Sequence, residues 1–330
     1  MKKLITVEEH YSSAEVVKKI QEIFENGTPE QKRGAAAAAG AAAPGVTEMG
    51  PERIAFMDAH GIDAQVISYA SAVPATMEPE YSVELCRLAN DTMAANAAAY
   101  PGRFYVFAHL PMGDPQAAAK ELERCVKELG FVGAMLSGHY HNLPYDDEHY
   151  FPIFEKAQEL DVPVYLHPGI VNPAITKQYY QGSWSERTTF LFSGFGVGWH
   201  YDVGVQIVRM ILAGVFDRLP QLKIMAGHWG ELVSFYMYRL DEIPQEQTGL
   251  QKKISDYFKE NIYVNPSGML YGEQFRYCLD TFGPDHITWG CDYPYRIKED
   301  IRSFLEEYDL SEEDREKIAH GNAEKLLHLV

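Results

Sequence analysis

Eight short runs of apolar residues recur along the chain, and most of them are separated by enough sequence for a helix. Most of the runs are almost continuously apolar and do not alternate with polar residues. Strands that are buried on both faces of a parallel sheet show this pattern. The predicted strands span residues 4–10, 64–70, 104–110, 131–138, 162–167, 223–228, 262–267 and 287–292.

Between these strands, apolar residues recur with the period of a helix, most clearly over 79–102, 114–130, 205–220 and 312–329. One of these predicted helices begins with Asp114 as N-cap and Pro115 in the first turn, and it ends at Gly130. Eight alternations of strand and helix predict an α/β fold of the (β/α)₈ TIM barrel type. An open doubly wound sheet is the alternative, and the lack of a GxGxxG or Walker motif weakens it.

Two long segments interrupt the alternation, and both follow the carboxyl end of a predicted strand. They cover about 11–50, with the alanine-rich stretch 34–45, and 168–203, which is rich in glycine, serine and aromatic residues. In a barrel, insertions at this end lie over the active site and act as lids or substrate walls. The alanine-rich stretch is equally compatible with an exposed helix or a flexible linker. We therefore expect one barrel domain over 1–330 with two insertions.

The charge balance excludes some classes of partner. Lys and Arg number 29 against 47 Asp and Glu, a net charge of −18, so the chain lacks the cationic surface that nucleic acid requires. No apolar run is long enough for a membrane span, and the start of the chain does not resemble a secretory signal. The four cysteines are widely spaced and indicate reduced thiols. These features predict a cytoplasmic protein that binds neither nucleic acid nor membrane.

Polar side chains with catalytic chemistry stand at the carboxyl ends of the predicted strands. This end of a barrel is where catalytic groups collect. The residues are Glu8 and His10 on the first strand, His109 on the third, His139 on the fourth, His167 on the fifth, His228 on the sixth, Asn265 and Ser267 on the seventh, and Asp292 on the eighth.

Four of these residues form a candidate metal site. Glu8 and His10 are two positions apart on a strand, so their side chains should point to the same face. Together with His167 and Asp292 they offer two carboxylates and two imidazoles. This mixed set suits one divalent ion per chain, either Zn²⁺ or Mn²⁺.

Other candidates have plainer interpretations. His139 and His141 form a second HxH pair that could bind a metal, but no further ligands complete such a site, so we expect a loop wall. His109 is expected to be a pocket or core residue. Cys291 should face away from Asp292 and belong to the core.

Several motifs in order along the chain carry a family resemblance: VEEH (7–10), VYLHPG (164–169), AGHWGE (226–231), GCDYP (290–294) and GNAEKLL (321–327). Together they resemble the amidohydrolase superfamily, in particular its branch of γ-resorcylate and 2,3-dihydroxybenzoate decarboxylases. Many members of the superfamily begin with HxH, whereas this chain has Glu8 at the first position, as the benzoate-type decarboxylases do.

The resemblance implies roles for further residues. His228 and Glu231 match a histidine and glutamate pair beside the substrate. Arg239, in YMYRLDE, matches an arginine that can reach the site of a neighbouring subunit. From this resemblance we expect a homodimer or homotetramer whose substrate is a small aromatic carboxylic acid.

Two reactions are compatible with these residues. In the decarboxylation of a hydroxybenzoate, Asp292 would protonate the ring carbon that carries the carboxylate, assisted by His228 and Glu231. In a hydrolysis of an ester, lactone, amide or C–C bond, Asp292 would instead take a proton from the attacking water. A barrel that only binds a small acid would leave the clustered ligands unexplained. We therefore expect a decarboxylase, with a hydrolase as the alternative.

Overall fold

The computed structural model describes residues 1–29, 32, 35–36 and 44–329. Its named strands form two parallel sheets. The first has the order β1 (Ile5–Tyr11), β2 (Ala64–Tyr69) and β3 (Phe104–Val106). The second has the order β4 (Ala108–His109), β5 (Ala134–Ser137), β6 (Val164–His167), β7 (Ile224–Ala226) and β8 (Ile262–Val264).

Backbone hydrogen bonds connect the two sheets where β3 passes into β4. Only Phe107 separates these strands, and its N–H donates to the carbonyl of Ile67 in β2 at 2.8 Å. The next N–H, that of Ala108, donates to the carbonyl of Gly133, the residue before β5, also at 2.8 Å. The predicted third strand, 104–110, is therefore one chain segment that changes partner at Phe107.

The other junction is formed by the predicted eighth strand, which is shorter than expected. Thr288 donates its N–H to Val264 of β8 at 2.9 Å, and Val7 of β1 donates to Trp289 at 2.8 Å. Regular pairing is limited to bridges at Ile287 and Trp289. These bonds place residues 287–289 between β8 and β1, and the strands close into the predicted (β/α)₈ barrel.

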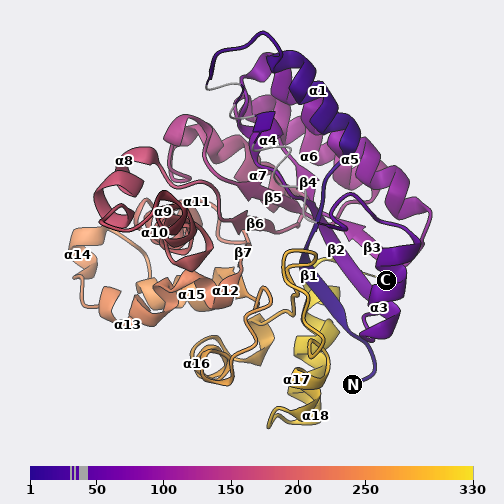
Figure 1. The fold of residues 1–330 in the computed structure, drawn as a ribbon. Coiled ribbons are helices and arrows are strands. Elements are labelled where there is room, and N and C mark those ends of the chain that lie inside the picture. Colours follow the sequence, from indigo (N-terminus) through magenta and orange to yellow (C-terminus); the bar gives the residue numbers. More distant parts are fainter. Residues whose placement is uncertain (30–31, 33–34, 37–43, 330) are drawn as a thin grey trace.

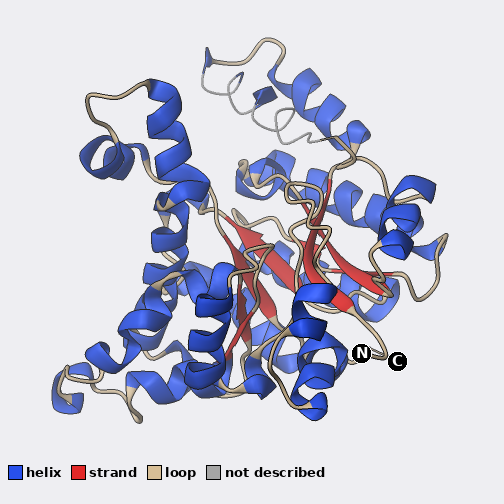
Figure 2. Ribbon diagram, turned by 60° about the horizontal axis from the view of Figure 1, so that its bottom comes forward, coloured by secondary structure: helices blue, strands red, loops and turns tan. Residues whose placement is uncertain are grey.

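Helices surround the strands on the outside (Figures 1 and 2). The longer ones are α1 (Ala14–Phe24), α3 (Pro51–Ala59), α5 (Pro79–Ala98), α6 (Pro115–Leu129), α7 (Phe151–Glu159), α10 (Gly198–Leu212), α15 (Ile254–Asn261) and α16 (Gly272–Phe282). The shorter ones are α4 (Val73–Thr76), α8 (Pro173–Ile175), α9 (Glu186–Leu191), α11 (Val215–Arg218), α12 (His228–Glu231), α13 (Met237–Leu240), α14 (Gln245–Thr248), α17 (Ser303–Glu307), α18 (Glu312–Glu316) and α19 (Asn322–Leu326).

The ends of α6 follow the sequence prediction. The Asp114 side chain accepts the N–H of Ala117 at 3.0 Å, which satisfies a donor of the first turn. Gly130 ends the helix with a φ of 71°, a conformation that a residue with a Cβ rarely adopts.

Alternate residues of the strands belong to two hydrophobic clusters. Residues that point into the barrel, such as Val66, Met135, Tyr165 and Met225, form one cluster. Their neighbours along the strands pack against the surrounding helices in a much larger second cluster. Tyr165 is therefore an inward-facing residue, and this orientation matters for the site.

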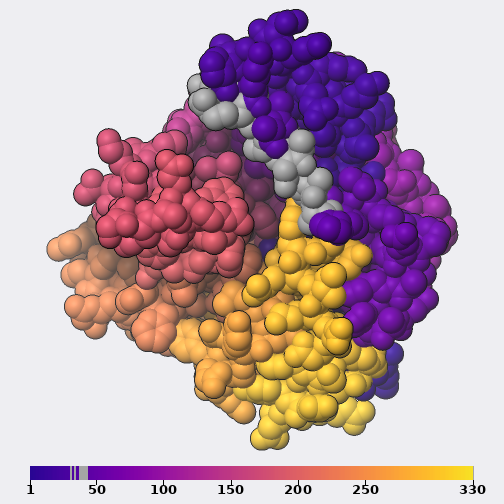
Figure 3. Space-filling view, viewed as in Figure 1, coloured from indigo at the N-terminus to yellow at the C-terminus, as the bar shows by residue number. Residues whose placement is uncertain are grey.

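The two insertions contain helices. In Figure 3 a hollow lies between the segment that carries α9 and α10 and the C-terminal segment. The first insertion contains α1 and returns to the barrel at Val46, whose carbonyl accepts the N–H of Ser12 at 2.9 Å. Most of the alanine-rich stretch 34–45 lies outside the described residues. The second insertion contains α8, α9 and the start of α10.

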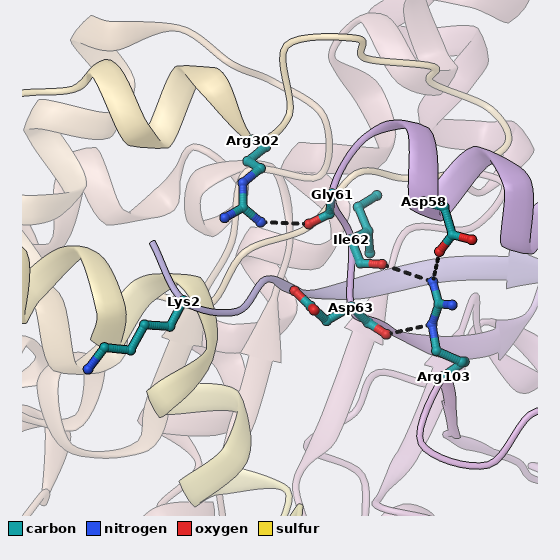
Figure 4. A pocket seen from close by; sticks show the side chains of 7 residues that line it. All are labelled: Lys2, Asp58, Gly61, Ile62, Asp63, Arg103 and Arg302. Atoms are coloured by element: carbon teal, nitrogen blue, oxygen red, sulfur yellow. Dashed lines mark hydrogen bonds and ion pairs between the residues drawn. The ribbon is translucent and has the colours of Figure 1, made fainter.

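A recess lies at the opposite end of the barrel, where β1, β2 and β3 begin (Figure 4). Its arginines form hydrogen bonds that connect neighbouring segments of the chain. Arg103 donates to the Asp58 carboxylate at 2.7 Å and to the Asp63 carbonyl at 2.8 Å. Arg302 donates to the Gly61 carbonyl at 2.8 Å.

Among the helices that the structure describes, none combines the length and apolar content of a membrane crossing.

Candidate active site

The first predicted ligand, Glu8, sits at an irregularity of β1. Its φ is 78°, and the pairing of β1 with β2 shifts register between Val7 and Glu9. Regular strand alternation, from which we predicted that Glu8 and His10 share a face, is therefore broken at Glu8. The two side chains nevertheless meet, because the bulge turns Glu8 toward the centre of the barrel mouth. Backbone strain of this kind is concentrated at functional sites.

The carboxylate of Glu8 is completely buried, and only one of its two oxygens accepts hydrogen bonds from the described residues. Tyr165 of β6 and Ser267, which follows β8, both donate hydroxyl hydrogens to Oε2. Oε1 has no hydrogen-bond partner among the described residues. Burial raises the pKa of Glu8 to about 7, and the nearby charge of Asp292 acts in the same direction. A cation beside Oε1 would reverse this shift.

The hydrogen bonds of His10 fix which ring nitrogen carries the proton. Ser68 donates its hydroxyl hydrogen to the Glu9 carbonyl at 3.2 Å, so the Nδ1–H of His10 donates to Ser68 Oγ, also at 3.2 Å. Nε2 is therefore the ring nitrogen left for another ligand, and it is buried without a hydrogen-bond partner among the described residues.

His167 at the end of β6 has the same arrangement. Its Nδ1 lies 2.7 Å from the carbonyl oxygen of Pro168, which can only accept, so Nδ1 carries the hydrogen. Burial lowers the pKa of His167 well below its ordinary value, which keeps the ring neutral. Its Nε2 lone pair is available toward Glu8, whose Oε1 lies 3.4 Å away.

These atoms form a group that fits a divalent metal ion. One ligand atom from each of Glu8, His10 and His167 lies within 4.8 Å of the other two. Asp292 adjoins the group, with Oδ1 3.2 Å from His10 Nε2. Both imidazoles direct Nε2 at the group and hold Nδ1 in a hydrogen bond, as metal-binding histidines do. The unpartnered Glu8 Oε1 and His10 Nε2 are the atoms that a metal would satisfy.

The predicted pair of His228 and Glu231 lies beside this group in α12. His228 Nδ1 donates to Glu231 Oε1 at 2.8 Å, and Ser267 Oγ accepts the backbone N–H of His228 at 3.0 Å. Burial alone would lower the pKa of His228, but the negative charges of Glu231 and Glu8 raise it to about 9. His228 is therefore an imidazolium at neutral pH, with Nε2–H available as a donor.

A third member of this arrangement, His200, was missed from the sequence. It comes from the second insertion, at the start of α10, and its Nδ1 donates to Glu231 Oε2 at 2.7 Å. The two imidazole rings are 4.4 Å apart between centroids. Burial raises the pKa of Glu231, but the charge of His228 and the bonds from both rings outweigh burial and lower it. No sequence spacing links His200 to AGHWGE, since their contact depends on the path of the insertion.

Arg239 lies away from this cluster. Its guanidinium in α13 forms an ion pair with Glu242, and its side chain is 75% exposed. The exposed side chains of Phe235, Tyr236 and Tyr238 lie close to it in sequence. Within one chain Arg239 therefore does not complete the site.

The other three histidines considered as candidates, His139, His141 and His109, follow their plainer interpretations. His139 Nε2 lies 2.7 Å from Asp202, and His141 Nε2 lies 2.8 Å from Glu78, so the two rings of the second HxH pair have different partners. His109 is 2% exposed, and burial lowers its pKa to about 3. Cys291 is fully buried in the core, as expected.

Comparison with known proteins places the chain among decarboxylases. It is 37% identical to the γ-resorcylate decarboxylase of Polaromonas sp. (strain JS666), over 84% of this chain and 86% of that protein. It is 34% identical to the decarboxylase orsB of Emericella nidulans, over 98% and 96% of the two chains.

Solved structures agree with this placement. The dihydroxybenzoic acid decarboxylase of Polaromonas sp. JS666, determined with bound manganese and the inhibitor 2-nitroresorcinol, superposes with a TM-score of 0.84 at 33% identity. The superposition covers 100% of this chain and 98% of that one. The model of the amidohydrolase family matches residues 37–329. The chain therefore belongs to the amidohydrolase family.

Proposed function

We propose that the protein is a metal-dependent, non-oxidative decarboxylase of a hydroxybenzoate whose hydroxyl group is adjacent to the carboxylate. The observation that carries this proposal is the group of Glu8, His10 and His167, with its unpartnered buried ligand atoms, beside the cationic His228. The similarity to aromatic acid decarboxylases over most of the chain supports the same reaction.

We propose Glu8, His10, His167 and Asp292 as the ligands of one Zn²⁺ or Mn²⁺ ion per chain. When bound, such an ion orients the substrate through its carboxylate and neighbouring oxygen and offsets their negative charge. Tyr165, Ser267 and Ser68 hold the ligands in place through the bonds described above. The manganese in the related dihydroxybenzoic acid decarboxylase favours Mn²⁺ as the first ion to test.

The proton transfer is assigned to Asp292, with His228 as the assisting group. Asp292 would deliver a proton to the ring carbon that bears the carboxylate. The bond from this carbon to the carboxylate then breaks, CO₂ leaves, and the electron pair of the broken bond restores the aromatic ring. His228 Nε2–H, oriented by Glu231, would donate a hydrogen bond to a substrate oxygen while the proton moves.

The direct experiment is a substrate panel with Mn²⁺-loaded protein. We expect CO₂ release from 2,6-dihydroxybenzoate, 2,3-dihydroxybenzoate or salicylate. We expect none from 4-hydroxybenzoate or benzoate, which lack the hydroxyl beside the carboxylate. Turnover of all five acids at similar rates would contradict the proposed two-point orientation of the substrate.

We further propose a dimer or tetramer in which Arg239 serves the site of a neighbouring subunit. Its exposure, and the three exposed aromatic residues Phe235, Tyr236 and Tyr238, favour a buried position in an assembly. Its guanidinium would then be available to a substrate carboxylate, because an arginine can bind a carboxylate through two hydrogen bonds.

A further inference from the structure

The two candidate metal ligands Glu8 and Asp292 both interrupt the pairing between β1 and the segment that closes the barrel. Glu8 has a φ of 78° and Asp292 a φ of 62°, conformations that no regular strand contains. The last regular backbone bond on this side joins Val7 N–H to the carbonyl of Trp289. Beyond it, the N–H groups of the residues around Asp292 need other acceptors, because they are buried.

Glu9 supplies these acceptors. Its Oε1 accepts the N–H of Cys291 at 2.9 Å, and its Oε2 accepts the N–H of Tyr293 at 2.7 Å. Glu9 is fully buried, and its carboxylate thus binds the residues immediately before and after Asp292. Glu9 itself lies between Glu8 and His10. The Glu9 side chain therefore connects the segment that carries Glu8 and His10 to the segment that carries Asp292.

Arg53 of α3 reinforces this connection. It is fully buried, donates from Nη2 to the carbonyl of His10 at 2.5 Å, and lies over the ring of Tyr293 at 4.7 Å. Burial raises the pKa of the Glu9 carboxyl, and the positive charge of Arg53 acts in the opposite direction. A further backbone bond, from His10 N–H to the Tyr293 carbonyl at 2.7 Å, closes the connection.

We propose that Glu9 is a positioning residue that sets the distance between Asp292 and the Glu8–His10 pair before any metal binds. This inference rests on the metal site proposed above. Glu9 touches neither substrate nor metal, and it acts through the backbone of residues 291–293. A glutamine at this position would keep one acceptor oxygen but would direct an NH₂ group at the other backbone N–H. These two donors repel each other, so one of the two hydrogen bonds between Glu9 and residues 291–293 would be lost.

The test compares Glu9→Gln with Glu121→Gln. Glu121 is a buried glutamate of α6 that accepts hydrogen bonds from Asn90 and Arg124, so the control removes a similar buried carboxylate away from the site. We expect Glu9→Gln to bind Mn²⁺ about 10- to 100-fold more weakly than the wild type, as outer-shell changes do. Its Co²⁺-loaded form should show a shifted visible absorption band. The control should match the wild type in both measurements.

A folded Glu9→Gln protein with wild-type Mn²⁺ affinity and an unchanged Co²⁺ spectrum would overturn the role of Glu9. A wild-type protein that binds no Mn²⁺ would instead contradict the metal site itself. These two failures are therefore distinguishable.

Amide hydrogen exchange of the metal-free wild type tests the proposal even if the variant does not fold. The amides of Cys291 and Tyr293 should remain protected without metal, because their acceptor is Glu9. Exchange as fast as in an exposed loop would mean that the metal, and not Glu9, holds this segment, and it would refute the proposal.

Discussion

Tyr165 donates a hydrogen bond to Glu8 across the interior of the barrel, from β6 to β1, over a separation of 157 residues. Asn265 donates to the same tyrosine oxygen at 3.1 Å, which leaves the Tyr165 hydrogen directed at Glu8. Because this bond occupies Oε2, it leaves Oε1 as the atom directed at the proposed metal.

Replacing Tyr165 with phenylalanine should weaken metal binding. Glu8 Oε2 would retain only Ser267, so the carboxylate could rotate away from His10 and His167. We expect Mn²⁺ to bind about 10-fold more weakly, and the free energy of unfolding to fall by about 1.5–3 kcal/mol, the usual value for a hydrogen bond to a charged group. Equilibrium titration with Mn²⁺ and urea unfolding measure the two effects.

Tyr257→Phe is the matched control for Tyr165→Phe. Tyr257 is equally buried and donates its hydroxyl hydrogen to the carboxylate of Asp217, at the outside of the barrel. It should lose stability without losing metal affinity. Equal losses of metal affinity in both variants would show that the effect of Tyr165 is general destabilisation.

Removal of one proposed ligand should empty the metal site. His167→Ala removes an Nε2 lone pair that no neighbouring residue replaces, so the variant should purify with far less than one metal ion per chain and without activity. His320→Ala is a control outside the site, since His320 pairs with Glu316 and Glu324. Elemental analysis measures the metal content, and full metal occupancy in the His167 variant would refute the ligand assignment.

The pair of His228 and Glu231 should produce a defined pH dependence. The pKa of His228 in the folded, metal-free chain is about 9, above its ordinary value of 6.5. The protonated ring therefore stabilises the fold fully below pH 6.5, and this contribution is lost as the pH rises through 9. In Glu231→Gln the pKa of His228 should fall, so the contribution to stability should be smaller and should be lost completely at a lower pH. An NMR titration of His228 measures the pKa, and an unchanged value would contradict the pairing.

Assembly and the role of Arg239 can be tested together. Light scattering should show a dimer or tetramer, and Arg239→Ala should lower kcat/KM without changing metal content, since Arg239 lies outside its own site. Arg218→Ala, which removes another exposed arginine with a glutamate partner, should leave kcat/KM unchanged. A fully active monomer at the assay concentration would rule out a role for Arg239 across an interface.

The sequence predicted the barrel and the proximity of Glu8, His10 and His167, which stay proposed ligands, because both depend on where the strands end. Continuous apolar runs identified the strands, and the positions of Glu8, His10 and His167 at strand ends placed them at one edge of the barrel. The predicted eighth strand is reduced to two bridges, because Asp292 adopts a left-handed conformation that a strand cannot contain. A pattern of apolar residues does not predict such a conformation.

The supporting residues could not be predicted in the same way. Tyr165 belongs to an apolar strand, Glu9 is one of two adjacent glutamates, and His200 lies in an insertion. Their roles arise from contacts between segments that are distant in sequence, and spacing carries no information on such contacts. The single domain over 1–330 and the cytoplasmic location stay predictions.

The reaction itself is tested most directly by turnover in D₂O. If Asp292 delivers a proton to the ring, Mn²⁺-loaded protein should convert an ortho-hydroxybenzoate to a phenol with one deuterium at the carbon that lost the carboxylate. Asp292→Asn should abolish this incorporation even in samples that retain metal. If all hydroxybenzoates are inert, while an ester or lactone is cleaved with incorporation of ¹⁸O from solvent, the protein is a hydrolase and the decarboxylase account is wrong.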